Sequence, residues 1–355
     1  MVEAIRIAVD EVNAGGGPLG RPFELFVEDG QTDPDAAVRA AKKLIEVNGV
    51  AAILGTWASA VTLAVAPLAI DASVIHMNTS GSPDITTLAD NGMVWRLQAS
   101  NTLFGEAFAK AVLARGHKTA ATMAINNPSG IGNTTEFKKY FEAQGGKVVA
   151  EVVYNANQSS YRSEVEKALG AEPEIVVMGS YAPDATIILK EWYQTGDEMK
   201  WLGPAFAINQ NVIDALGKDV VEGVLAVDSI PDRDSQAYAR LQTLYQDATG
   251  KDLFSNIYAG MTYDMVHLLA LGIEAAGSVD SGVISAKLGD ISSPPGEPVS
   301  SFQDGAKLLR EGKDIDYQGA SSIVDFDEAG DVRPDFGVFE IHDGKPQLAE
   351  EIPMR

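Results

Sequence analysis

The sequence predicts an α/β protein with two lobes, each built around a parallel β-sheet. Short apolar runs that are typical of buried parallel strands alternate with longer runs whose apolar residues repeat at helical spacing. Such repeated βα units form parallel sheets with right-handed crossovers and flanking helices. The units are too many for one modest sheet, and a chain of 355 residues is long enough for two domains with a sizeable core.

Each element is predicted from a local pattern. Strands are expected where short apolar runs end at small or polar residues, at 22–28, 50–54, 74–77, 93–97, 119–125, 147–154, 175–178, 201–202 and 224–227. Helices are expected where apolar residues recur every three or four positions, at 2–13, 34–48, 60–70, 102–115, 133–144, 160–169, 184–195, 234–250 and 258–276. Prolines and a glycine predict a surface loop at 291–299.

Three segments are candidates for crossings between the lobes. Residues 98–101 lie between a strand and a helix, residues 228–232 contain a proline after a strand, and residues 321–328 form an extended stretch. We therefore expect lobe 1 to comprise residues 1–99 and 231–321, and lobe 2 to comprise residues 100–230 and 322–355.

The composition excludes several classes of function. The formal net charge of −23 argues against a nucleic-acid partner, because the phosphates would be repelled. The chain has no cysteine, which excludes thiol catalysis, disulfides and thiolate metal sites. No run approaches the ~18 apolar residues that a membrane helix needs, so we expect no membrane span.

Signatures of enzymes are also absent from the sequence. It contains no HExxH, GxSxG or P-loop motif. The histidines are dispersed without metal-ligand spacing, and a structural role is expected for each, at His76, His117, His267 and His342. We therefore expect neither catalysis nor a cofactor.

Two serine-bearing loops follow neighbouring predicted strands. Ser59 lies between the strand at 50–54 and the next helix, and Ser80 lies just past the strand at 74–77. Small ligands bind at the carboxyl ends of strands in open α/β sheets. Both hydroxyls, with nearby backbone amides, are therefore candidates for holding an anion. Serine before a helix is also a common N-cap, and the pattern leaves both interpretations open.

The order of several motifs resembles the type I periplasmic substrate-binding proteins of ABC transporters, in the branched-chain amino-acid-binding group. Each motif is weak alone, but together and in this order they are specific and span essentially the whole chain. They are AVDEVNAGGG (8–17) with LGR (19–21), EDGQTDP (28–34), residues 51–59, Ser82–Pro83, Trp95–Arg96, Tyr258 with Tyr263–Asp264, and FGVF (336–339). The resemblance implies two Rossmann-like lobes joined by a three-crossover hinge, which close as a clamp on a small molecule.

The resemblance also implies which residues contact the ligand. It places the ligand carboxylate at Ser59. It places a second recognition loop at Ser80 and Gly81, an aromatic residue of the second lobe at Tyr181, and a wall formed by the late helix at Tyr258. Trp57, beside Ser59, is the expected lid or floor. Core packing is the alternative for each aromatic side chain, because Tyr and Trp are often largely buried.

Two departures from the family pattern bear on the ligand. Amino-acid binders of this family hold the ligand ammonium with an acidic side chain after a Gly-Pro pair, but here Gly203–Pro204 is followed by Ala205 and Phe206. A family tyrosine of lobe 2 is replaced by Ile131. A desolvated ligand cation needs a compensating charge, so either another carboxylate serves or the ligand lacks an ammonium. We predict a carboxylate ligand with a hydrophobic or aromatic body, ahead of a plain amino acid.

The start of the chain departs from the family as well. It opens directly into a helix with no visible export signal, whereas family members begin with a strand and a loop, so we expect a segment upstream of Met1. The resemblance implies a monomer that docks on ABC permease subunits and is located in the periplasm or outside the cell. A cytosolic ligand-sensing regulator on the same fold, similar to the amide sensors, is the alternative that the missing signal supports.

Overall fold

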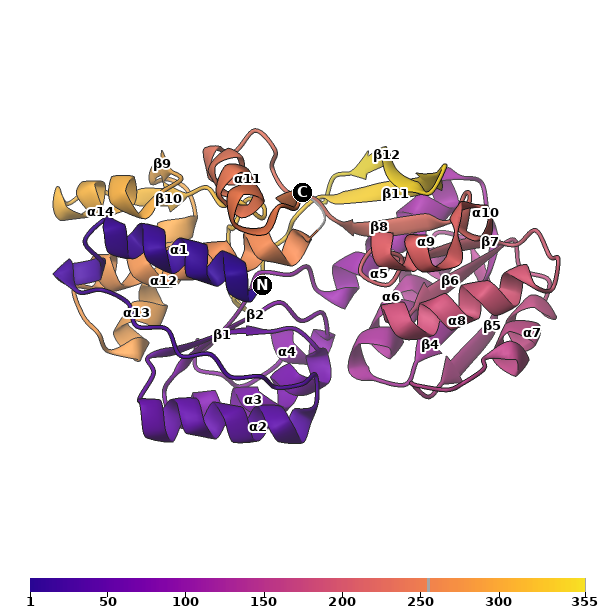
Figure 1. The fold of residues 1–355 in the computed structure, drawn as a ribbon, viewed down its shortest axis with the longest axis horizontal. Coiled ribbons are helices and arrows are strands. Elements are labelled where there is room, and N and C mark those ends of the chain that lie inside the picture. The colour runs from indigo at the N-terminus through magenta and orange to yellow at the C-terminus, as the bar shows by residue number, and fades with distance from the viewer. Residues whose placement is uncertain (254–255, 355) are drawn as a thin grey trace. The chain divides into compact units, whose positions relative to one another are not determined.

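The computed structural model describes residues 1–253 and 256–354. The chain divides into two compact units: unit 1 is Met1–Ala99 with Ile230–Pro334, and unit 2 is Ser100–Ser229 with Asp335–Arg355. The chain therefore passes between the units after Ala99, Ser229 and Pro334, which can be followed by colour in Figure 1.

The third crossing differs from the prediction, which placed the return to lobe 2 at residue 322. Residues 322–334 belong to unit 1, and two of their side chains contact strand β3 (Val94–Arg96). The ring of Phe326 packs edge to face on Trp95, with centroids 4.8 Å apart. Asp331 forms a buried ion pair with Arg96. These contacts join residues far apart in the sequence, so no local pattern could show them.

Unit 1 contains a three-stranded parallel sheet with helices around it. Its strands are β1 (Ala52–Thr56), β2 (Ile75–Asn78) and β3, in the order β1-β2-β3. A separate parallel pair is formed by β9 (Glu297–Val299) and β10 (Ile315–Tyr317). The α-helices are α1 (Val2–Ala14), α2 (Pro34–Lys42), α3 (Ser59–Asp71), α4 (Pro83–Thr86), α11 (Gln236–Thr249), α12 (Ile257–Ala276), α13 (Ser281–Leu288) and α14 (Phe302–Arg310). Short helical turns lie at Pro18–Gly20, Lys43–Asn48 and Asp290–Ser292.

The core of unit 1 gathers around α12. This helix is buried at every position from 259 to 273. Helix α1 lies beside it (Figure 1) and contributes an apolar stripe at helical spacing, Ala4, Ile5, Ala8, Val9 and Val12. The predicted surface loop at 291–299 is only partly correct, because Ile291 and Val299 are buried in this same core.

The strand predicted at 22–28 is wrong. Residues 21–30 form no strand, and no neighbouring strand in the described part of the chain hydrogen-bonds to them. The backbone of Phe23 is paired instead with the side chain of Asn13: the Phe23 N–H donates to Asn13 Oδ1 at 2.7 Å, and Asn13 Nδ2 donates to the Phe23 carbonyl at 3.0 Å. An alternating apolar pattern does not make a strand when no partner strand is present.

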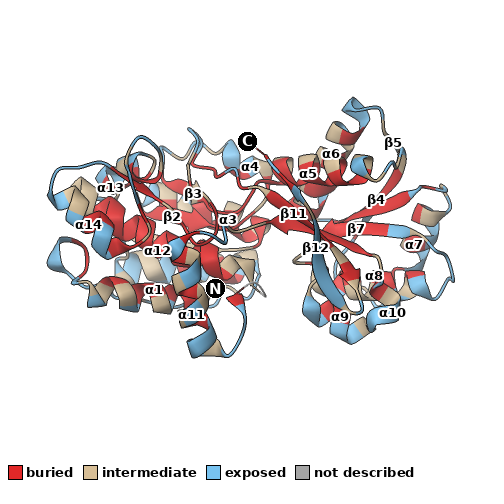
Figure 2. Ribbon diagram, turned by 90° about the horizontal axis from the view of Figure 1, so that it is seen from above, coloured by how far each residue is buried: buried red, intermediate tan, exposed pale blue. Residues whose placement is uncertain are grey.

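Unit 2 is a seven-stranded sheet with helices on both faces. Its strands are β4 (Thr119–Ile125), β5 (Lys147–Tyr154), β6 (Ile175–Gly179), β7 (Lys200–Pro204), β8 (Leu225–Ser229), β11 (Phe336–His342) and β12 (Lys345–Ile352). Its helices are α5 (Asn101–Ala114), α6 (Pro128–Ala143), α7 (Arg162–Leu169), α8 (Ala182–Tyr193), α9 (Gln210–Leu216) and α10 (Lys218–Val221). Figure 2 shows the inner strands buried, whereas β12 at the sheet edge is largely exposed.

The strand order of unit 2 predicts where a ligand would bind. The order is β12-β11-β8-β7-β6-β4-β5, with β4 to β8 parallel and β11 antiparallel to both neighbours. The connection from β4 runs to β5 on one side, whereas the connection from β6 runs to β7 on the other side. The order of the strands therefore reverses between β4 and β6. Ligands of doubly wound sheets bind at such a switch point, outside the carboxyl ends of the strands.

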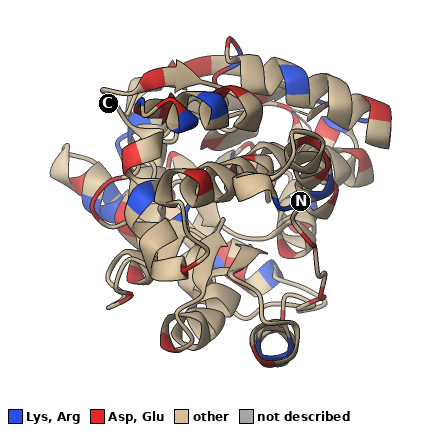
Figure 3. Cartoon of the chain, turned by 90° about the vertical axis from the view of Figure 1, so that its left-hand side faces the viewer, with Lys and Arg blue, Asp and Glu red and all other residues tan. Residues whose placement is uncertain are grey.

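The surface carries both signs of charge. In the view of Figure 3, basic and acidic residues are interspersed along the helices that face the viewer. No single helix within the described ranges is long and apolar enough to cross a membrane, although the bent pair at 257–276 and 281–292 passes that test by length and composition alone.

Candidate functional site

The first predicted loop leads from β1 into the start of α3. The N-cap of α3 is Ala58, which has no side-chain cap. The N–H groups of Ser59 and Ala60, in the first turn, have no hydrogen-bond partner within residues 1–253 and 256–354. Such an uncapped helix start carries a partial positive charge and donors that suit an anion.

Ser59 does not act as a helix cap. It is the first residue of α3, 1% exposed, and its hydroxyl oxygen accepts a hydrogen bond from the Ser82 N–H at 3.1 Å. Its own proton has no acceptor among the described residues, so the hydroxyl remains able to donate. Ser82 is the residue that caps a helix here, because its hydroxyl accepts from the Asp84 N–H at the start of α4.

Ser80 is bound within unit 1. Its hydroxyl donates to the Trp57 carbonyl at 2.8 Å, and its N–H donates to Asn78 Oδ1 at 3.1 Å. Both donors of Ser80 are therefore already used within unit 1, and the contact of Ser80 with a ligand stays a prediction. The neighbouring Gly81 N–H has no partner in the described part of the chain. In this loop, Gly81 offers the available amide.

The two loops are joined by a buried chain of hydroxyl groups. Ser80 Oγ lies 2.5 Å from Thr62 Oγ1, which lies 2.6 Å from Thr56 Oγ1, which lies 2.9 Å from His76 Nε2. Each hydroxyl has one proton, and the carbonyl of Trp57 can only accept. The Ser80 proton is thus used on Trp57, so Thr62 donates to Ser80, Thr56 donates to Thr62, and the His76 Nε2–H donates to Thr56.

This direction fixes the tautomer of His76. With the proton on Nε2, its Nδ1 is a bare acceptor, and it has no partner among the residues described. Burial lowers the pKa of His76 to about 4, so the ring is neutral at pH 7. The predicted structural role of His76 is consistent with this geometry. The sequence pattern did not include Thr56 and Thr62, although both stand where β1 ends and α3 begins.

Two predicted aromatic residues meet in unit 1. The rings of Trp57 and Tyr258 lie edge to face, with centroids 6.0 Å apart and planes at 88°. Both side chains are half-buried rather than part of the closed core. Trp57 directly precedes Ala58 and Ser59, so this aromatic pair begins next to the uncapped start of α3.

In unit 2, the predicted loop at 126–132 is already helical. Helix α6 begins at Pro128 because Asn127 caps it, with Oδ1 accepting from the Gly130 N–H at 2.8 Å. Ile131 therefore lies in the first turn of α6 and is 39% exposed. An added Cβ on Gly130 would lie 2.8 Å from the Gly179 carbonyl oxygen. The glycine lets the start of α6 approach the end of β6.

The other predicted residues of unit 2 gather at the same edge of the sheet. Tyr181 follows β6 and Phe206 follows β7, and their ring centroids are 6.2 Å apart. Burial raises the pKa of Tyr181, and hydrogen bonds with the side chains of Ser129 and Asn127 partly oppose the rise, so the phenol is neutral. Ala205 is half-buried, and its N–H donates to the Val227 carbonyl at 3.0 Å. These residues lie at the carboxyl ends of β4, β6 and β7.

One acidic residue at this edge lay outside the predicted site. Asp228, near the end of β8, is 1% exposed, and its Oδ1 accepts from the Ser229 N–H at 2.9 Å. It follows Val227, the register partner of Pro204 in β7, so it lies next to Ala205 across the strand pair. The sequence signal that could have identified Asp228 is its position directly after an apolar strand. No group of three or more acidic or histidine residues within the described ranges is arranged to hold a metal.

Comparisons with known proteins agree with this fold. A family model described as periplasmic binding protein matches residues 1–304. A leucine-, isoleucine-, valine-, threonine- and alanine-binding protein of Pseudomonas aeruginosa is 26% identical over 341 residues, which cover 95% of this chain and 83% of that protein.

Solved structures show the same architecture. A leucine binding protein, LivK, of Thermotoga maritima matches with a TM-score of 0.84 and 23% identity, covering 99% of this chain and 92% of the other. A solute binding protein of an ABC transporter from R. palustris, solved in complex with benzoate, matches with a TM-score of 0.79 and 21% identity, with coverage of 99% and 92%. The resemblance found in the sequence is confirmed: the chain belongs to the periplasmic binding protein family, with the type I fold of its branched-chain amino acid group.

Proposed function

We propose that this protein is the extracytoplasmic solute-binding component of an ABC importer and that it binds a small carboxylate with a hydrophobic or aromatic body. Family membership supports the transport role. The Pseudomonas relative is named for binding apolar amino acids and threonine, and the R. palustris protein was solved with benzoate. Both ligand classes carry a carboxylate next to an organic body. In this role the protein acts as a monomer that docks on permease subunits and returns its ligand unchanged.

The observation that carries the carboxylate assignment is the uncapped start of α3 beside the Ser59 hydroxyl. The Ser59 oxygen is occupied by the Ser82 N–H, whereas its proton and the N–H groups of Ala60 and Gly81 have no partner among the described residues. Several neutral donors and a helix start stabilise a carboxylate without a paired cation. We propose that the ligand carboxylate accepts from these donors.

The ligand body is assigned to the aromatic residues. Trp57 and Tyr258 offer ring edges and faces next to the carboxylate donors, and Tyr181 and Phe206 offer an aromatic surface in unit 2. Aromatic pairs of this kind contribute about 0.5–1.5 kcal/mol beyond burial. We propose that the two units contribute these surfaces to one ligand, as in the clamp that the family implies. A micromolar affinity of about −8 kcal/mol is sufficient to offset a modest closure cost.

The choice between an acid and an amino acid depends on unit 2. A buried ammonium needs an acidic partner, and the residues after Gly203–Pro204 are Ala205 and Phe206. Asp228 is the acidic residue beside Ala205. An acid without an ammonium requires no such partner, which favours an aromatic or aliphatic acid. An amino-acid ligand would require Asp228 in that role.

Calorimetric titration tests this proposal. The protein is first unfolded and refolded by dialysis to remove any ligand that co-purifies, which mass spectrometry of the extract identifies. Benzoate, phenylacetate, L-leucine and L-isoleucine are then titrated into the wild type and into Asp228→Asn. We expect the aromatic acids to bind at least about tenfold more tightly than leucine, a difference of about 1.4 kcal/mol, and to be insensitive to Asp228→Asn. The ligand assignment would be overturned if the wild type binds leucine tightly and does not bind the aromatic acids, and if Asp228→Asn loses the leucine binding.

A further inference from the structure

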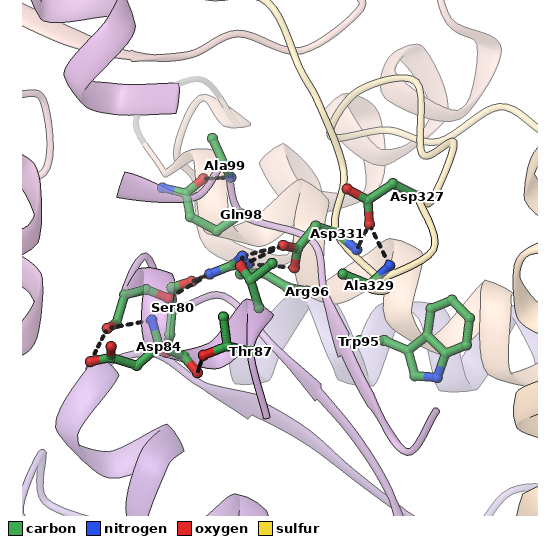
Figure 4. A network of polar contacts seen from close by, with 12 residues as sticks. Ser80, Asp84, Thr87, Trp95, Arg96, Gln98, Ala99, Asp327, Ala329 and Asp331 are labelled. Atoms are coloured by element: carbon green, nitrogen blue, oxygen red, sulfur yellow. Dashed lines mark hydrogen bonds and ion pairs between the residues drawn. The ribbon is translucent and has the colours of Figure 1, made fainter. Parts of the chain in front are cut away.

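Arg96, in β3, is a buried cation next to the loop of the proposed carboxylate site. Its side chain is 0% exposed. Figure 4 shows its guanidinium between two parts of unit 1, the loop that contains Ser80 and the segment that contains Asp331. A buried arginine in this place is the obvious candidate for direct contact with an anionic ligand, and its hydrogen bonds argue against that role.

The guanidinium has no donor left for a ligand. It has five N–H groups, and the structure provides five acceptors. Nε and Nη2 donate to the two carboxylate oxygens of Asp331, with Nε–Oδ1 at 2.8 Å, and Nη2 also donates to the Thr86 hydroxyl. Nη1 donates to the Ser82 carbonyl at 2.8 Å and lies 3.5 Å from the Ser80 carbonyl. Arg96 therefore holds the loop rather than a ligand.

This hold determines where the Gly81 amide points. In a trans peptide the C=O of one residue and the N–H of the next point in opposite directions. Because the Ser80 carbonyl is turned towards Arg96, the N–H of Gly81 is turned away from it. The Ser82 carbonyl is also held by Arg96, and the Ser82 N–H donates to Ser59 Oγ. The guanidinium thus sets the direction of the free Gly81 N–H. It also holds Ser82, whose N–H donates to the Ser59 oxygen and leaves the Ser59 proton available.

Asp331 supplies the matching negative charge. It is placed by a tight turn in which Asp327 Oδ1 accepts from the N–H groups of Ala329 and Asp331, at 2.9 and 3.0 Å. The carbonyl of Gly330 accepts from the Arg96 N–H at 2.8 Å. Gly330 has a φ of +73°, and an added Cβ would lie 2.8 Å from the Val94 carbonyl oxygen, so only glycine fits this approach.

We propose that Arg96 is a positioning residue for ligand binding: its fork of hydrogen bonds orients the loop 80–82 so that the Gly81 N–H and the Ser59 hydroxyl donate to the ligand carboxylate, while Asp331 neutralises its charge. This inference rests on the proposed function. It assigns carboxylate selectivity to the geometry of the guanidinium and not to its positive charge.

Arg96→Lys separates these two roles, because lysine keeps the charge and loses the planar fork. The readout is the ratio of dissociation constants for an acid and its neutral amide, measured by calorimetry for benzoate with benzamide and for L-leucine with L-leucinamide. We expect the wild type to prefer the carboxylate and Arg96→Lys to reduce this preference about tenfold. If Arg96→Lys does not fold, Thr86→Val, at an exposed position that contacts both members of the ion pair, should reduce the preference in the same direction by about threefold.

Tyr263→Phe is the matched control for a general loss of stability. Its hydroxyl bonds to Glu11 and Arg240, elsewhere in unit 1, so the variant should lower the melting temperature and keep the acid-to-amide ratio. An unchanged ratio in Arg96→Lys or Thr86→Val, with both affinities falling together, would overturn the positioning role alone. A wild type that binds none of the four probes would overturn the proposed function and the positioning role with it.

Discussion

The backbone N–H of Ser82 donates to the hydroxyl oxygen of Ser59 at 3.1 Å, which joins the loop after β2 to the start of α3. This bond occupies an acceptor site of Ser59 and leaves its proton as a donor. One contact therefore prepares the hydroxyl for an anionic ligand and fixes its distance from the Gly81 amide.

Ser59→Ala should lower the affinity for benzoate by at least about tenfold, because a hydrogen bond to a charged acceptor contributes about 1.5–3 kcal/mol. The free energy of unfolding of the ligand-free protein should fall by only about 1 kcal/mol, the loss of one hydrogen bond from the Ser82 N–H. Ser301→Ala, which removes the N-cap of α14, is the control and should lower stability without changing affinity. Calorimetry and urea unfolding measure the two quantities. A stability loss in Ser59→Ala with unchanged affinity would assign Ser59 a structural role.

The stability of the protein should rise with pH between about 4 and 6.5 because of His76. Burial lowers its pKa in the folded state to about 4, below the ordinary value of 6.5. In this window the unfolded chain binds a proton at His76 that the folded chain does not, so folding is favoured as the pH increases. The contribution is complete above about pH 6.5 and is lost as the pH falls towards 4, with an upper limit of ~3 kcal/mol.

His76→Gln removes this titration and keeps an N–H that can donate to Thr56. Urea unfolding at intervals from pH 4.5 to 7 should therefore give a flatter dependence for His76→Gln than for the wild type. Parallel curves for the two proteins would show that His76 does not titrate as its burial indicates.

Gly130→Ala should destabilise unit 2 and weaken ligand binding. The added Cβ would lie 2.4 Å from the Ile125 side chain and 2.5 Å from its carbonyl oxygen, so α6 must shift. Overpacking of this kind costs about 1–3 kcal/mol, and the shift moves Ile131 and the partners of Tyr181. Gly289→Ala is the control, because Gly289 has a right-handed φ of −67° and an open surrounding. It should leave thermal stability and affinity nearly unchanged; equal effects of the two substitutions would contradict the close-approach explanation.

Phe206→Glu should change the preferred ligand. The substitution places an acidic side chain after the Gly203–Pro204 pair. This side chain repels the carboxylate of benzoate and attracts the ammonium of an amino-acid ligand. We expect benzoate affinity to fall at least about tenfold and the ratio of leucine to benzoate affinity to increase. Phe206→Leu, which keeps an apolar side chain, should show a smaller loss of benzoate affinity and no gain for leucine. Unchanged benzoate binding in Phe206→Glu would remove Phe206 from the site.

Local patterns were sufficient to predict most of the fold. Apolar runs that end at small polar residues identified β1 and β2, and thus the loops that carry Ser59 and Ser80. The start of α6 was placed too late, although Asn127–Pro128 is a recognisable start signal. The strand predicted at 22–28 failed because strand formation depends on a partner that the segment itself does not encode.

The arrangement of the candidate site could be predicted only in part. Ser59 and Ser80 follow predicted strand ends, so their neighbourhood was visible in the sequence. Tyr181 and Tyr258 were placed only by the family resemblance, and Tyr258 lies in α12 rather than after a strand. The interactions that orient these side chains were not visible in the sequence. Arg96 bonds to Asp331 across 235 positions, and the direction of the hydroxyl chain depends on which partner each proton has. Both features depend on packing between segments that are distant in the sequence.

The most direct test of the account is a crystal structure of the refolded protein with benzoate. The account predicts that a carboxylate oxygen lies about 3 Å from Ser59 Oγ and that the other lies within hydrogen-bond distance of the Gly81 N–H, with Arg96 still bound to Asp331. A benzoate carboxylate bound directly to the Arg96 guanidinium, or placed away from the start of α3, would contradict it.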